Sequence, residues 1–491
     1  MLKRFVLAGL IITLLSAATV SSAVLLEVDQ AVQIFKHSTI PLDPAVKELL
    51  AGVKPGKPQT ILVIGDDRRR AEALMKHPPP TRSDTMMLVR LDPSKHATAV
   101  MSLPRDLLVN IPGHGIDKLN AAFAIGEDRL TLSTIRSLVG IPIHHYIRVT
   151  FWGFKDAVNR LGCVYTDVDR HYFNDNNPPF GGGPPYAAID VQAGYQKLCG
   201  NKALDYVRYR HLDSDLVRAA RQQQFISEAK DQIGLSKIFS NRDALLRIFG
   251  HSVRTDIDST HAILSLLKLV ATSAADPVVQ IPFPATDAPD GSGNVEISPF
   301  ALQQTVHRFL AVKGPKARQA KTRSTPRRKK RKHGRAPAVK VPAGLVDSLA
   351  AGRQEGRTLQ HKLGRLPVFY PTLMPAGGRY RDDDSRAYSI TASGKHYGSY
   401  RIVVFQGDIG QYYGVQGTRW ATPPILDHPT RLDKIAGRTY ELFYDGSRIR
   451  MVAWHTPKGT YWVSNTLLRS LTNKQMLAIA RSAHRVRRAG A

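Results

Sequence analysis

One segment near the middle of the chain limits how the rest can fold. Lys313–Lys340 contains 13 lysines or arginines and no aspartate or glutamate, and three prolines interrupt it. A segment of this composition cannot bury enough apolar surface to offset the entropy that is lost on ordering. We therefore expect a disordered basic linker over residues 313–343. The 491-residue chain then divides into a larger part before the linker and a smaller part after it, at residues 344–488.

The N-terminus indicates where these parts reside. Phe5–Leu26 is a stretch of 22 residues without a charge, and two basic residues precede it. As a helix it would be about 33 Å long, enough to cross the hydrocarbon core of a membrane, which is about 30 Å thick. The pattern favours a single-pass signal anchor, with residues 1–4 in the cytoplasm and the bulk of the chain outside the bacterial cytoplasmic membrane. A cleaved signal peptide is the alternative, because residues 21–23 are small.

The composition excludes several classes of protein. Hydrophobic residues make up 43% of the chain and charged residues 22%, near the globular averages of about 45–50% and 25%. These values exclude a disordered, collagen-like or polytopic membrane protein. The two cysteines exclude a disulfide-dense scaffold and a zinc site built from a cysteine cluster. The net charge of +29 favours anionic partners, but the predicted position outside the membrane argues against nucleic acid.

Between residues 59 and 312, after a juxtamembrane connector at residues 27–58, short apolar strands alternate with helical patterns. The alternation favours an α/β sandwich around one central sheet. The expected strands are Thr60–Ile64, Met86–Leu91, Thr98–Leu103, Tyr146–Phe151 and Val164–Asp169. The expected helices are Asp128–Val139, Gly153–Leu161, Leu216–Ile233, Asn241–Ser252, Ser259–Ser273 and Pro299–Leu310. The part after the linker predicts a smaller α+β domain, with strands such as Tyr400–Phe405, Thr439–Tyr444 and Ile449–Trp454 and a last helix over Lys474–Arg485.

Two carboxylates lie next to apolar strands. Asp67 follows the run Ile61–Gly65, and Asp84 comes just before Met86–Leu91. Ligands of α/β proteins bind at the carboxyl ends of strands, and Mg²⁺ takes one or two protein carboxylates together with phosphate oxygens and water. The pattern therefore predicts a Mg²⁺ site. Roles as turn residues or helix caps would account for both aspartates equally.

Arg105 follows a third apolar strand, in the sequence Ser-Leu-Pro-Arg-Asp, and Lys118 opens the sequence Lys-Leu-Asn-Ala-Ala. The rigid guanidinium group binds two phosphate oxygens at once, whereas lysine acts as a point charge. Arg105 therefore points to a phosphate ligand. A structural ion pair between Arg105 and Asp106 is the alternative interpretation.

The segment from Tyr206 to Phe225 carries the most information. If its beginning is extended, Arg208 and Arg210 share one face. A helix that starts near residue 215 would put three more polar residues on one face: Asp215, Arg218 and Gln222. Four arginines within fourteen residues repel one another unless a pyrophosphate or buried carboxylates lie among them. A solvated basic helix face is the other interpretation.

Five motifs, taken in this order, resemble the LytR-CpsA-Psr (LCP) family. The chain has GxDxR at residues 65–69, RSDT at 82–85, S-[IL]-PRD at 102–106, K-[IL]-NAA at 118–122 and R-x-R…D-x-x-R-x-x-RQQ at 208–223. One such motif alone says little, whereas all five follow the family order over roughly Thr60–Gly234. The resemblance implies an α-β-α sandwich with a central mixed sheet.

The resemblance also implies an enzyme that attaches a glycopolymer to peptidoglycan. The donor would be a glycan linked to polyprenyl pyrophosphate and the acceptor a peptidoglycan sugar hydroxyl, with polyprenyl phosphate released and the prenyl chain held in the apolar core. Asp67 and Asp84 match the Mg²⁺ ligands of the family, with Mn²⁺ as the alternative ion. The pyrophosphate-binding set comprises Arg105, Lys118, Arg208, Arg210, Arg218, Arg221 and Gln222, with Arg69 and Arg82 as secondary members. Asp215 matches the acidic residue that orients the arginines, which gives a catalytic set of Asp67, Asp84, Arg105 and Asp215.

The chemistry leaves two questions open. The general base that activates the acceptor hydroxyl is Asp84 or Asp215, unless the metal lowers the pKa of that hydroxyl. The same site would also hydrolyse polyprenyl pyrophosphate with water. A third hypothesis is a non-catalytic cell-wall adaptor, in which the linker and the C-terminal part bind anionic wall polymers.

Two features depart from the family pattern. Where many members have Gly-Gly-Val, this chain has Cys163. Outside the membrane, Cys163 and Cys199 most simply form a disulfide; two buried thiols are the alternative. Three tryptophans of the C-terminal part would form either a glycan-binding face or part of the core: Trp420, Trp454 and Trp462.

Overall fold

The computed structural model describes residues 40–54, 56–67, 83–176, 188–209, 213–233, 278–290, 292–313, 341–407 and 411–486, with short runs between 240 and 273. The predicted signal anchor, part of the connector and most of the predicted basic linker lie outside these ranges. So do large parts of the helices expected at Asn241–Ser252 and Ser259–Ser273. Within the described residues, no helix is both long enough and apolar enough to cross a membrane.

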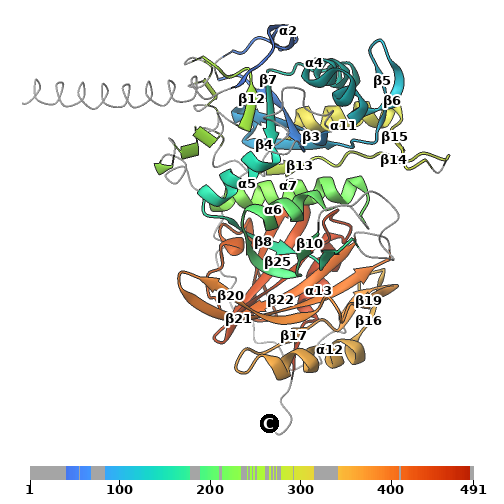
Figure 1. The fold of residues 1–491 in the computed structure, drawn as a ribbon. Helices are drawn as coiled ribbons and strands as arrows, with labels where there is room; N and C mark the ends of the chain where they lie inside the picture. Colours follow the sequence, from blue (N-terminus) through green and yellow to red (C-terminus); the bar gives the residue numbers. More distant parts are fainter. Residues whose placement is uncertain are drawn as a thin grey trace, which may run out of the picture.

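A mixed sheet of seven strands lies at the centre of the N-terminal part (Figure 1). Its strands follow the order β1-β12-β7-β2-β3-β4-β13. β7 and β2 are parallel neighbours, whereas β2, β3 and β4 are antiparallel neighbours. In sheet order the strands are Ile40–Pro41, Val253–Thr255, His145–Thr150, Gln59–Asp66, Ser83–Asp92, Ala97–Leu103 and Val278–Gln280. The mixed central sheet of an α/β fold is therefore confirmed.

Helices cover both faces of this sheet. α4 (Leu119–Val139) and α11 (Pro299–Ala311) lie on one face, and α5 (Phe151–Arg160) and α7 (Asp215–Gln232) lie on the other, with α6 (Gly200–Arg208) beneath α7 (Figure 1). Strands that are covered on both faces form continuous apolar runs. Accordingly, the side chains of Leu62, Ile64 and Leu88 in β2 and β3 are completely buried.

Two helices begin at residues that the sequence pattern did not predict. α4 starts at Leu119, and it kinks where Gly126 and Glu127 leave the helical conformation. The apolar periodicity is regular only after this kink, which is why the helix was expected from residue 128 onward. Phe151, expected in a strand, opens α5, because the Thr150 side chain accepts a hydrogen bond from the backbone N–H of Gly153 and caps the helix.

A smaller layer of strands lies below α7 and carries the disulfide. β8 (Val164–Val168) pairs antiparallel with β11 (Gly194–Leu198). Cys163 and Cys199 flank the paired ends and form a disulfide, with their Cα atoms 4.6 Å apart, so the predicted pairing is confirmed. The other short elements of the N-terminal part are α2 (Pro44–Lys47), η1 (Pro93–Lys95), β5 (Leu108–Ile111), β6 (Gly115–Lys118), β9 (Tyr172–Asn174), β10 (Ile189–Val191), β14 (Thr286–Asp287) and β15 (Val295–Glu296).

The C-terminal region, residues 341–486, is built around an antiparallel sheet of eight strands. Seven strands follow the order β19-β21-β22-β26-β25-β24-β23, and β20 also pairs with β21. These strands are β19 (Gly378–Tyr380), β20 (Arg386–Ala392), β21 (Lys395–Gln406), β22 (Tyr412–Thr418), β23 (Arg431–Ile435), β24 (Arg438–Asp445), β25 (Arg448–Thr456) and β26 (Gly459–Ser464). The remaining elements are β16 (Leu345–Asp347), α12 (Leu349–Lys362), β17 (Phe369–Tyr370), β18 (Leu373–Pro375), η2 (Pro424–Leu426), α13 (Asn473–Arg481) and β27 (His484–Arg485).

One expectation for this region is corrected, and one open alternative is decided. The last helix ends at Arg481 rather than Arg485, because β27 leaves the helical path and pairs with β17. Trp454 and Trp462 are completely buried, so they belong to the core and not to a glycan-binding face. Trp420 is half-buried and stacks on Tyr397 at a ring-centroid distance of 5.5 Å.

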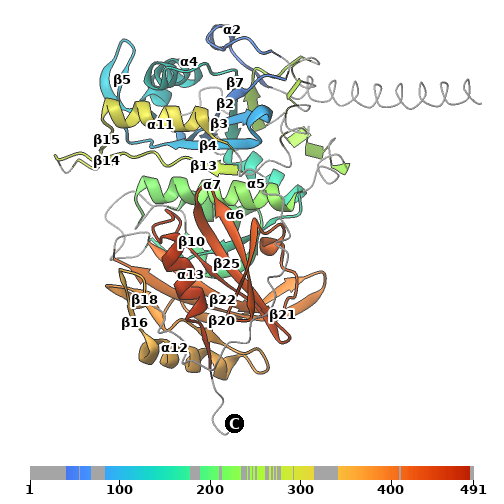
Figure 2. The same ribbon diagram turned by 180° about the vertical axis from the view of Figure 1, so that it is seen from behind.

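The C-terminal region packs directly against α7 and the strands below it (Figures 1 and 2). The buried guanidinium of Arg401 on β21 forms an ion pair with Asp167 on β8. Tyr195 of β11 belongs to the same apolar cluster as Ile390 and Trp462. The regions on either side of the predicted linker therefore share a buried interface.

Candidate functional site

Two predicted metal ligands meet at the edge of the central sheet where β2 ends and β3 begins. The two strands are antiparallel, and Asp66 lies opposite Ser83. The register shifts between Gly65 and Asp66, which leaves Asp84 as an extra residue in β3. Asp67, half-buried, follows at once. The backbone thus brings Asp67 and Asp84 to the same sheet edge from neighbouring strands.

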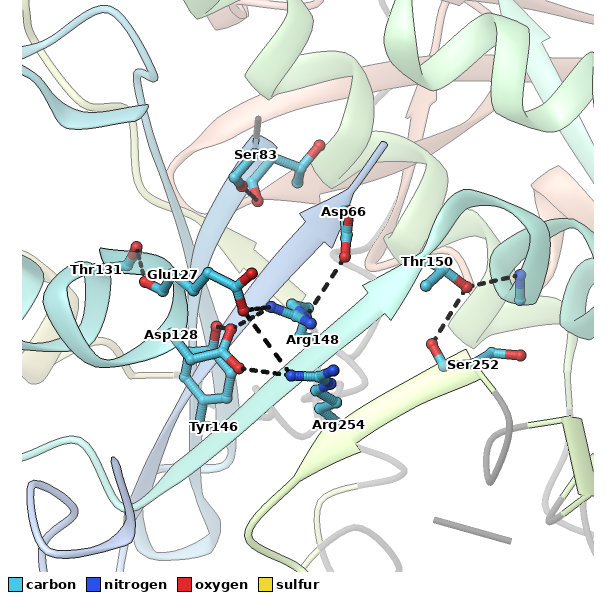
Figure 3. Close-up of polar contacts among 12 residues, drawn as sticks. Asp66, Ser83, Glu127, Asp128, Thr131, Tyr146, Arg148, Thr150, Ser252 and Arg254 are labelled. Carbon is cyan, nitrogen blue, oxygen red and sulfur yellow. Dashed lines mark hydrogen bonds and ion pairs between the residues drawn. The ribbon is translucent and has the colours of Figure 1, made fainter. Parts of the chain in front are cut away.

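Asp66 belongs to a buried ion network that the sequence analysis missed (Figure 3). Arg148 on β7 is 3% exposed, and its Nε lies 3.5 Å from Oδ2 of Asp66. Its Nη1 lies 2.7 Å from Oδ1 of Asp128, which also accepts a hydrogen bond from the Tyr146 hydroxyl at 2.7 Å. Burial opposes the charged form, yet Asp128 and Asp66 raise the pKa of the Arg148 guanidinium above its ordinary value. The network therefore anchors the end of β2 that leads into Asp67.

Glu127 bends α4 toward this network. Its backbone has φ 41° and ψ −133°, a conformation that costs free energy for a residue with a side chain. Its carboxylate lies 3.5 Å from Nη1 of Arg148 and 3.9 Å from Nη1 of Arg254. Figure 3 shows these contacts of Glu127 with Arg148 and Arg254. The partners come from β2, α4, β7 and β12, so no local sequence pattern indicated the network.

Neighbouring glutamines of α7 attach this helix to two strands that carry family motifs. The side-chain amide of Gln222 donates to the Thr85 hydroxyl on β3 at 3.0 Å and to the carbonyl of Val207 at 3.1 Å. The amide of Gln223 donates to the Ser102 hydroxyl on β4 at 3.0 Å. Three motifs that are far apart in the sequence therefore lie at one sheet edge. The pyrophosphate-binding role of Gln222 stays a prediction, because these contacts all join protein groups.

Arg105 and Lys118 share one carboxylate. The Nε of Arg105 lies 3.4 Å from Oδ2 of Asp106, and the Nζ of Lys118 lies 3.3 Å from Oδ1 of the same residue. The backbone N–H of Asn120 donates to the Arg105 carbonyl at 3.0 Å, which holds the third and fourth motifs together. The ion pair between Arg105 and Asp106 is thus present. With a second cation on the same carboxylate, the cluster retains an excess of positive charge for an anion.

Arg208 is the last residue of α6 and does not lie on a strand. The expectation of an extended segment from Tyr206 was wrong, because Ala203, Leu204 and Tyr206 are buried at helical spacing. The Nη2 of Arg208 lies 2.7 Å from Oδ1 of Asp205, one helical turn earlier, and the arginine side chain is 24% exposed. Arg208 therefore lies near the site with one carboxylate partner and part of its surface accessible.

α7 begins at Asp215, as the spacing predicted. Ser214 caps it by accepting a hydrogen bond from the backbone N–H of Val217. Asp215, Arg218 and Gln222 therefore share one face of a real helix, and Arg218 is 5% exposed. Only the backbone of Asp84 and Asp215 is described, and three further predicted site residues lie outside the described residues: Arg69, Arg82 and Arg210.

Arg221, another predicted pyrophosphate ligand, lies in a fully buried cluster. Its Nη2 is 2.5 Å from Oδ2 of Asp213, and its Nη1 donates to the carbonyl of Tyr206 at 2.8 Å. On the other side of Asp213, Nη2 of Arg170 lies 2.6 Å from Oδ1. The Tyr172 ring faces both guanidiniums, with centroid distances of 4.5 and 4.6 Å. In this structure Arg221 supports the loop before α7, and its role as a ligand stays a prediction.

A cavity of about 130 Å³ lies between the cluster of Arg105 and Asp106 and the cluster of Arg221 and Asp213. Its lining includes Asp106 from the motif that contains Arg105, and Asp213 and Ser214 from the loop before α7. The third and fifth motifs thus border one hollow, although 101 residues of chain separate them.

The comparisons with known proteins identify the family. A model described as the LytR_cpsA_psr family matches residues 22–308, more than half of the chain. The chain belongs to this family. The C-terminal region lies outside the matched residues.

Curated relatives match parts of the chain. The Bacillus subtilis polyisoprenyl-teichoic acid–peptidoglycan teichoic acid transferase TagT is 31% identical over 210 residues, which cover 43% of this chain and 63% of TagT. TagU of Oceanobacillus iheyensis, which bears the same transferase name, is 32% identical over 206 residues, with coverages of 40% and 58%. The chain thus spans between half and two thirds of the length of these relatives. A solved structure, "TagT bound to LI-WTA", is 27% identical, covers 53% of this chain and 92% of that chain, and gives a TM-score of 0.40.

The arrangement in this LytR_cpsA_psr member suits phosphate chemistry. The backbone positions of Asp67 and Asp84 are those at which carboxylates would hold an ion that completes its shell with phosphate oxygens and water. Within the described residues, no group of three or more His, Cys, Asp or Glu side chains would hold a metal by itself. The cations around Arg105 and Arg208 lie at the same end of the fold, where they can neutralise a pyrophosphate.

Proposed function

We propose that this chain is a membrane-anchored, extracytoplasmic phosphotransferase that links a glycopolymer to peptidoglycan. The observation that carries the proposal is the attachment of α7 to β3 and β4 through Gln222 and Gln223, which gathers the family motifs at one sheet edge. Family membership supports it, as do the names of TagT and TagU. Residues 5–26 would supply the single-pass anchor in the cytoplasmic membrane.

The proposed reaction moves one phosphate. The oxygen of a peptidoglycan sugar hydroxyl attacks the phosphorus that carries the glycopolymer. The bond between this phosphorus and the bridging oxygen of the pyrophosphate breaks, and polyprenyl phosphate leaves with the electron pair. The hydroxyl proton passes to a base, and a phosphodiester joins the glycopolymer to the wall. No oxidant or further substrate is required.

The residues of this chain would mainly position charge, because phosphoryl transfer depends on orientation and on neutralisation of negative charge. Arg105, Arg208 and Arg218 would bind the pyrophosphate oxygens. Asp67 and Asp84 would hold Mg²⁺, which, when bound, would neutralise charge that develops on the phosphate. Asp84 or Asp215 would accept the proton of the acceptor hydroxyl. The prenyl chain would occupy apolar surface next to the sheet.

A transfer assay tests the proposal. Full-length protein is mixed with a labelled lipid-linked glycan and peptidoglycan chains, with Mg²⁺ present, and the label is located. The expected result is label bound covalently to peptidoglycan. Asp67→Ala and Asp84→Ala should each abolish this signal while thermal unfolding is unchanged. An exposed aspartate outside the site, Asp347, provides the matched control in Asp347→Ala, which should transfer normally.

The same assay distinguishes the two alternatives. Free glycan phosphate without label on the wall would indicate a polyprenyl-pyrophosphate hydrolase. Unchanged donor, with protein that still sediments with the wall, would indicate a non-catalytic adaptor. Full activity of both aspartate variants would show that the metal site is wrongly assigned.

A further inference from the structure

The C-terminal region contains a polar hollow of about 590 Å³ at the end of the molecule that lies away from the central sheet. It is bordered by the chain after α12, the chain after β22, the turn between β25 and β26, and β27. Both ribbon views place α12 at this far end (Figures 1 and 2). The hollow is therefore separate from the sheet edge that carries the family motifs.

Four exposed cations from different segments line this hollow, and we call it the C-terminal cationic pocket: Arg365, Arg419, Lys458 and Arg485. His455 also lines it. Within the described part of the chain, none of the four forms an ion pair with a carboxylate. The carboxylate of Glu441 lies 3.2 Å from Nε2 of His455 and is engaged there.

Convergence of these charges is costly unless an anion lies among them. Like charges that face one hollow raise each other's free energy, and the penalty falls when an anion enters. Other cations of this chain show the contrast, since Arg105 and Arg208 each contact a carboxylate.

We propose that the C-terminal cationic pocket binds a phosphodiester segment of an anionic wall glycopolymer. Guanidinium groups bind phosphate oxygens in pairs, and the pocket contains three of them. Its volume lies in the range of sites for small ligands, about 300–1,000 Å³, which accommodates a few sugar- or polyol-phosphate units. A concave site is also better suited to a chain segment than to a flat membrane surface. The identity of the polymer rests on the proposed function, whereas the anion chemistry does not.

Such a site would serve the transfer reaction without taking part in it. A glycopolymer whose reducing end lies at the sheet edge extends many units away from it. A long donor could then bind at both sites of one molecule. Binding at the C-terminal cationic pocket would raise the effective concentration of the donor at the sheet edge. Short donors would gain nothing from the pocket.

Lysine footprinting tests the binding on the full-length chain. A glycerol-phosphate trimer is added, and the rate of acylation of each lysine is measured by mass spectrometry. Lys458 should be protected about tenfold when the ligand concentration is ten times its dissociation constant, since about nine sites in ten are then filled. Three exposed lysines of the same region lie outside the pocket and should react at unchanged rates: Lys395, Lys434 and Lys474. Asp67→Ala should leave the protection of Lys458 intact, so the pocket and the proposed activity can fail separately.

Matched variants distinguish the effect of charges gathered in the C-terminal cationic pocket from the effect of the total charge of the region. The pocket variant combines Arg365→Gln, Arg419→Gln and Arg485→Gln. The control variant removes the same charge at exposed arginines elsewhere in the region, with substitutions Arg353→Gln, Arg357→Gln and Arg448→Gln. The trimer should bind the pocket variant at least about tenfold more weakly, as expected when charged hydrogen bonds are lost, and bind the control variant nearly as tightly as the wild type.

Three results would overturn the proposal. Equal loss of affinity in both variants would show general charge attraction. Protection of Lys458 by inorganic phosphate at the same concentration as the trimer would show a simple anion site and no site for a polymer. Protection by phosphatidylglycerol vesicles but not by the trimer would show a membrane contact.

Discussion

Arg208 and Arg221 belong to one sequence motif, but the structure gives them opposite surroundings. Arg221 is fully buried, shares Asp213 with Arg170 and donates to a backbone carbonyl. Arg208 is 24% exposed and contacts only Asp205 among the carboxylates of the described residues. The resemblance to the family predicted that both bind pyrophosphate. Burial, rather than its place in the motif, marks Arg221 as a structural cation, whereas part of the Arg208 side chain remains accessible to a ligand.

The largest expected effect tests the buried member of this comparison. Arg221→Met keeps much of the side-chain volume but leaves Asp213 buried with one cation in place of two. Removing one partner from a buried ion pair costs about 3–5 kcal/mol, so the free energy of unfolding should fall by about that amount. Urea unfolding, followed by tryptophan fluorescence, measures it.

Arg208→Met is the matched control for this experiment. Its ion pair with Asp205 is partly exposed, so the free energy of unfolding should fall by less than about 1 kcal/mol. If Arg221→Met unfolds like the wild type but no longer binds the lipid-linked donor, Arg221 is a ligand and the comparison fails.

Glu228 extends the comparison to a buried acid that forms no ion pair among the described residues. It lies on α7, completely buried, and its Oε1 accepts a hydrogen bond from Gln224 at 3.2 Å. Burial raises the pKa of its carboxyl group to about 8, with Asp167 on β8 adding to the rise and Arg450 on β25 opposing it. The amide of Gln224 and the backbone N–H of Asp167 both donate to Oε1, which favours the charged form, so burial is the main reason that this carboxyl group keeps its proton.

The expected consequence is an inverse pH dependence. Between pH 4.5, the ordinary pKa, and about 8, the folded carboxyl keeps a proton that the unfolded chain has lost. The free energy of unfolding should therefore fall as pH rises through this window and level off above it. Glu228→Gln should remove this contribution and be more stable than the wild type at pH 8. Glu296 is exposed on β15, so Glu296→Gln controls for the loss of a charge. Identical pH profiles of the Glu228 variant and the wild type would contradict the raised pKa of Glu228.

The sequence predicted those features that depend on short-range patterns. The apolar strands around Ile61–Gly65 and Met86–Leu91, the start of α7 at Asp215 and the disulfide all follow from local composition or from the compartment. The extended segment considered from Tyr206 is not found, because Tyr206 and Arg208 belong to α6, whose buried face is set by packing against α5 and α7.

Other features were beyond prediction because they depend on long-range register. The Arg148 network joins residues from four separate elements, and its geometry exists only once β2 and β7 lie parallel. The same holds for Arg401, which finds Asp167 more than 200 residues away in the sequence. No pattern in the sequence indicates that the C-terminal sheet packs against α7; the same pattern would fit an independent domain.

A smaller effect tests the partly exposed cations. Arg208→Ala should weaken binding of the lipid-linked donor by about 10–100-fold, because each charge-assisted hydrogen bond contributes about 1.5–3 kcal/mol. Arg208→Lys should restore only part of this loss, because a lysine has a single point charge and no planar fork. Equilibrium binding of a labelled polyprenyl pyrophosphate measures both variants. Full restoration by lysine would indicate general charge attraction, and Arg208 would then not be a specific ligand.

The smallest expected effect concerns Lys313–Lys340, a segment whose lysines and arginines have no aspartate or glutamate among them. Its 13 positive charges would attract anionic wall polymers over a distance set by screening, about 8 Å at an ionic strength of about 0.15 M. Replacing its lysines and arginines with serine and glycine should reduce co-sedimentation with purified cell wall, most clearly at low salt. Turnover of a soluble short-chain donor should change by less than about twofold, since a screened, long-range attraction leaves the contacts at the sheet edge untouched. A passive spacer, extended only by its own charge, would instead let the neutral variant sediment like the wild type at every salt concentration. The salt series therefore decides whether the positive charge of Lys313–Lys340 attracts the wall.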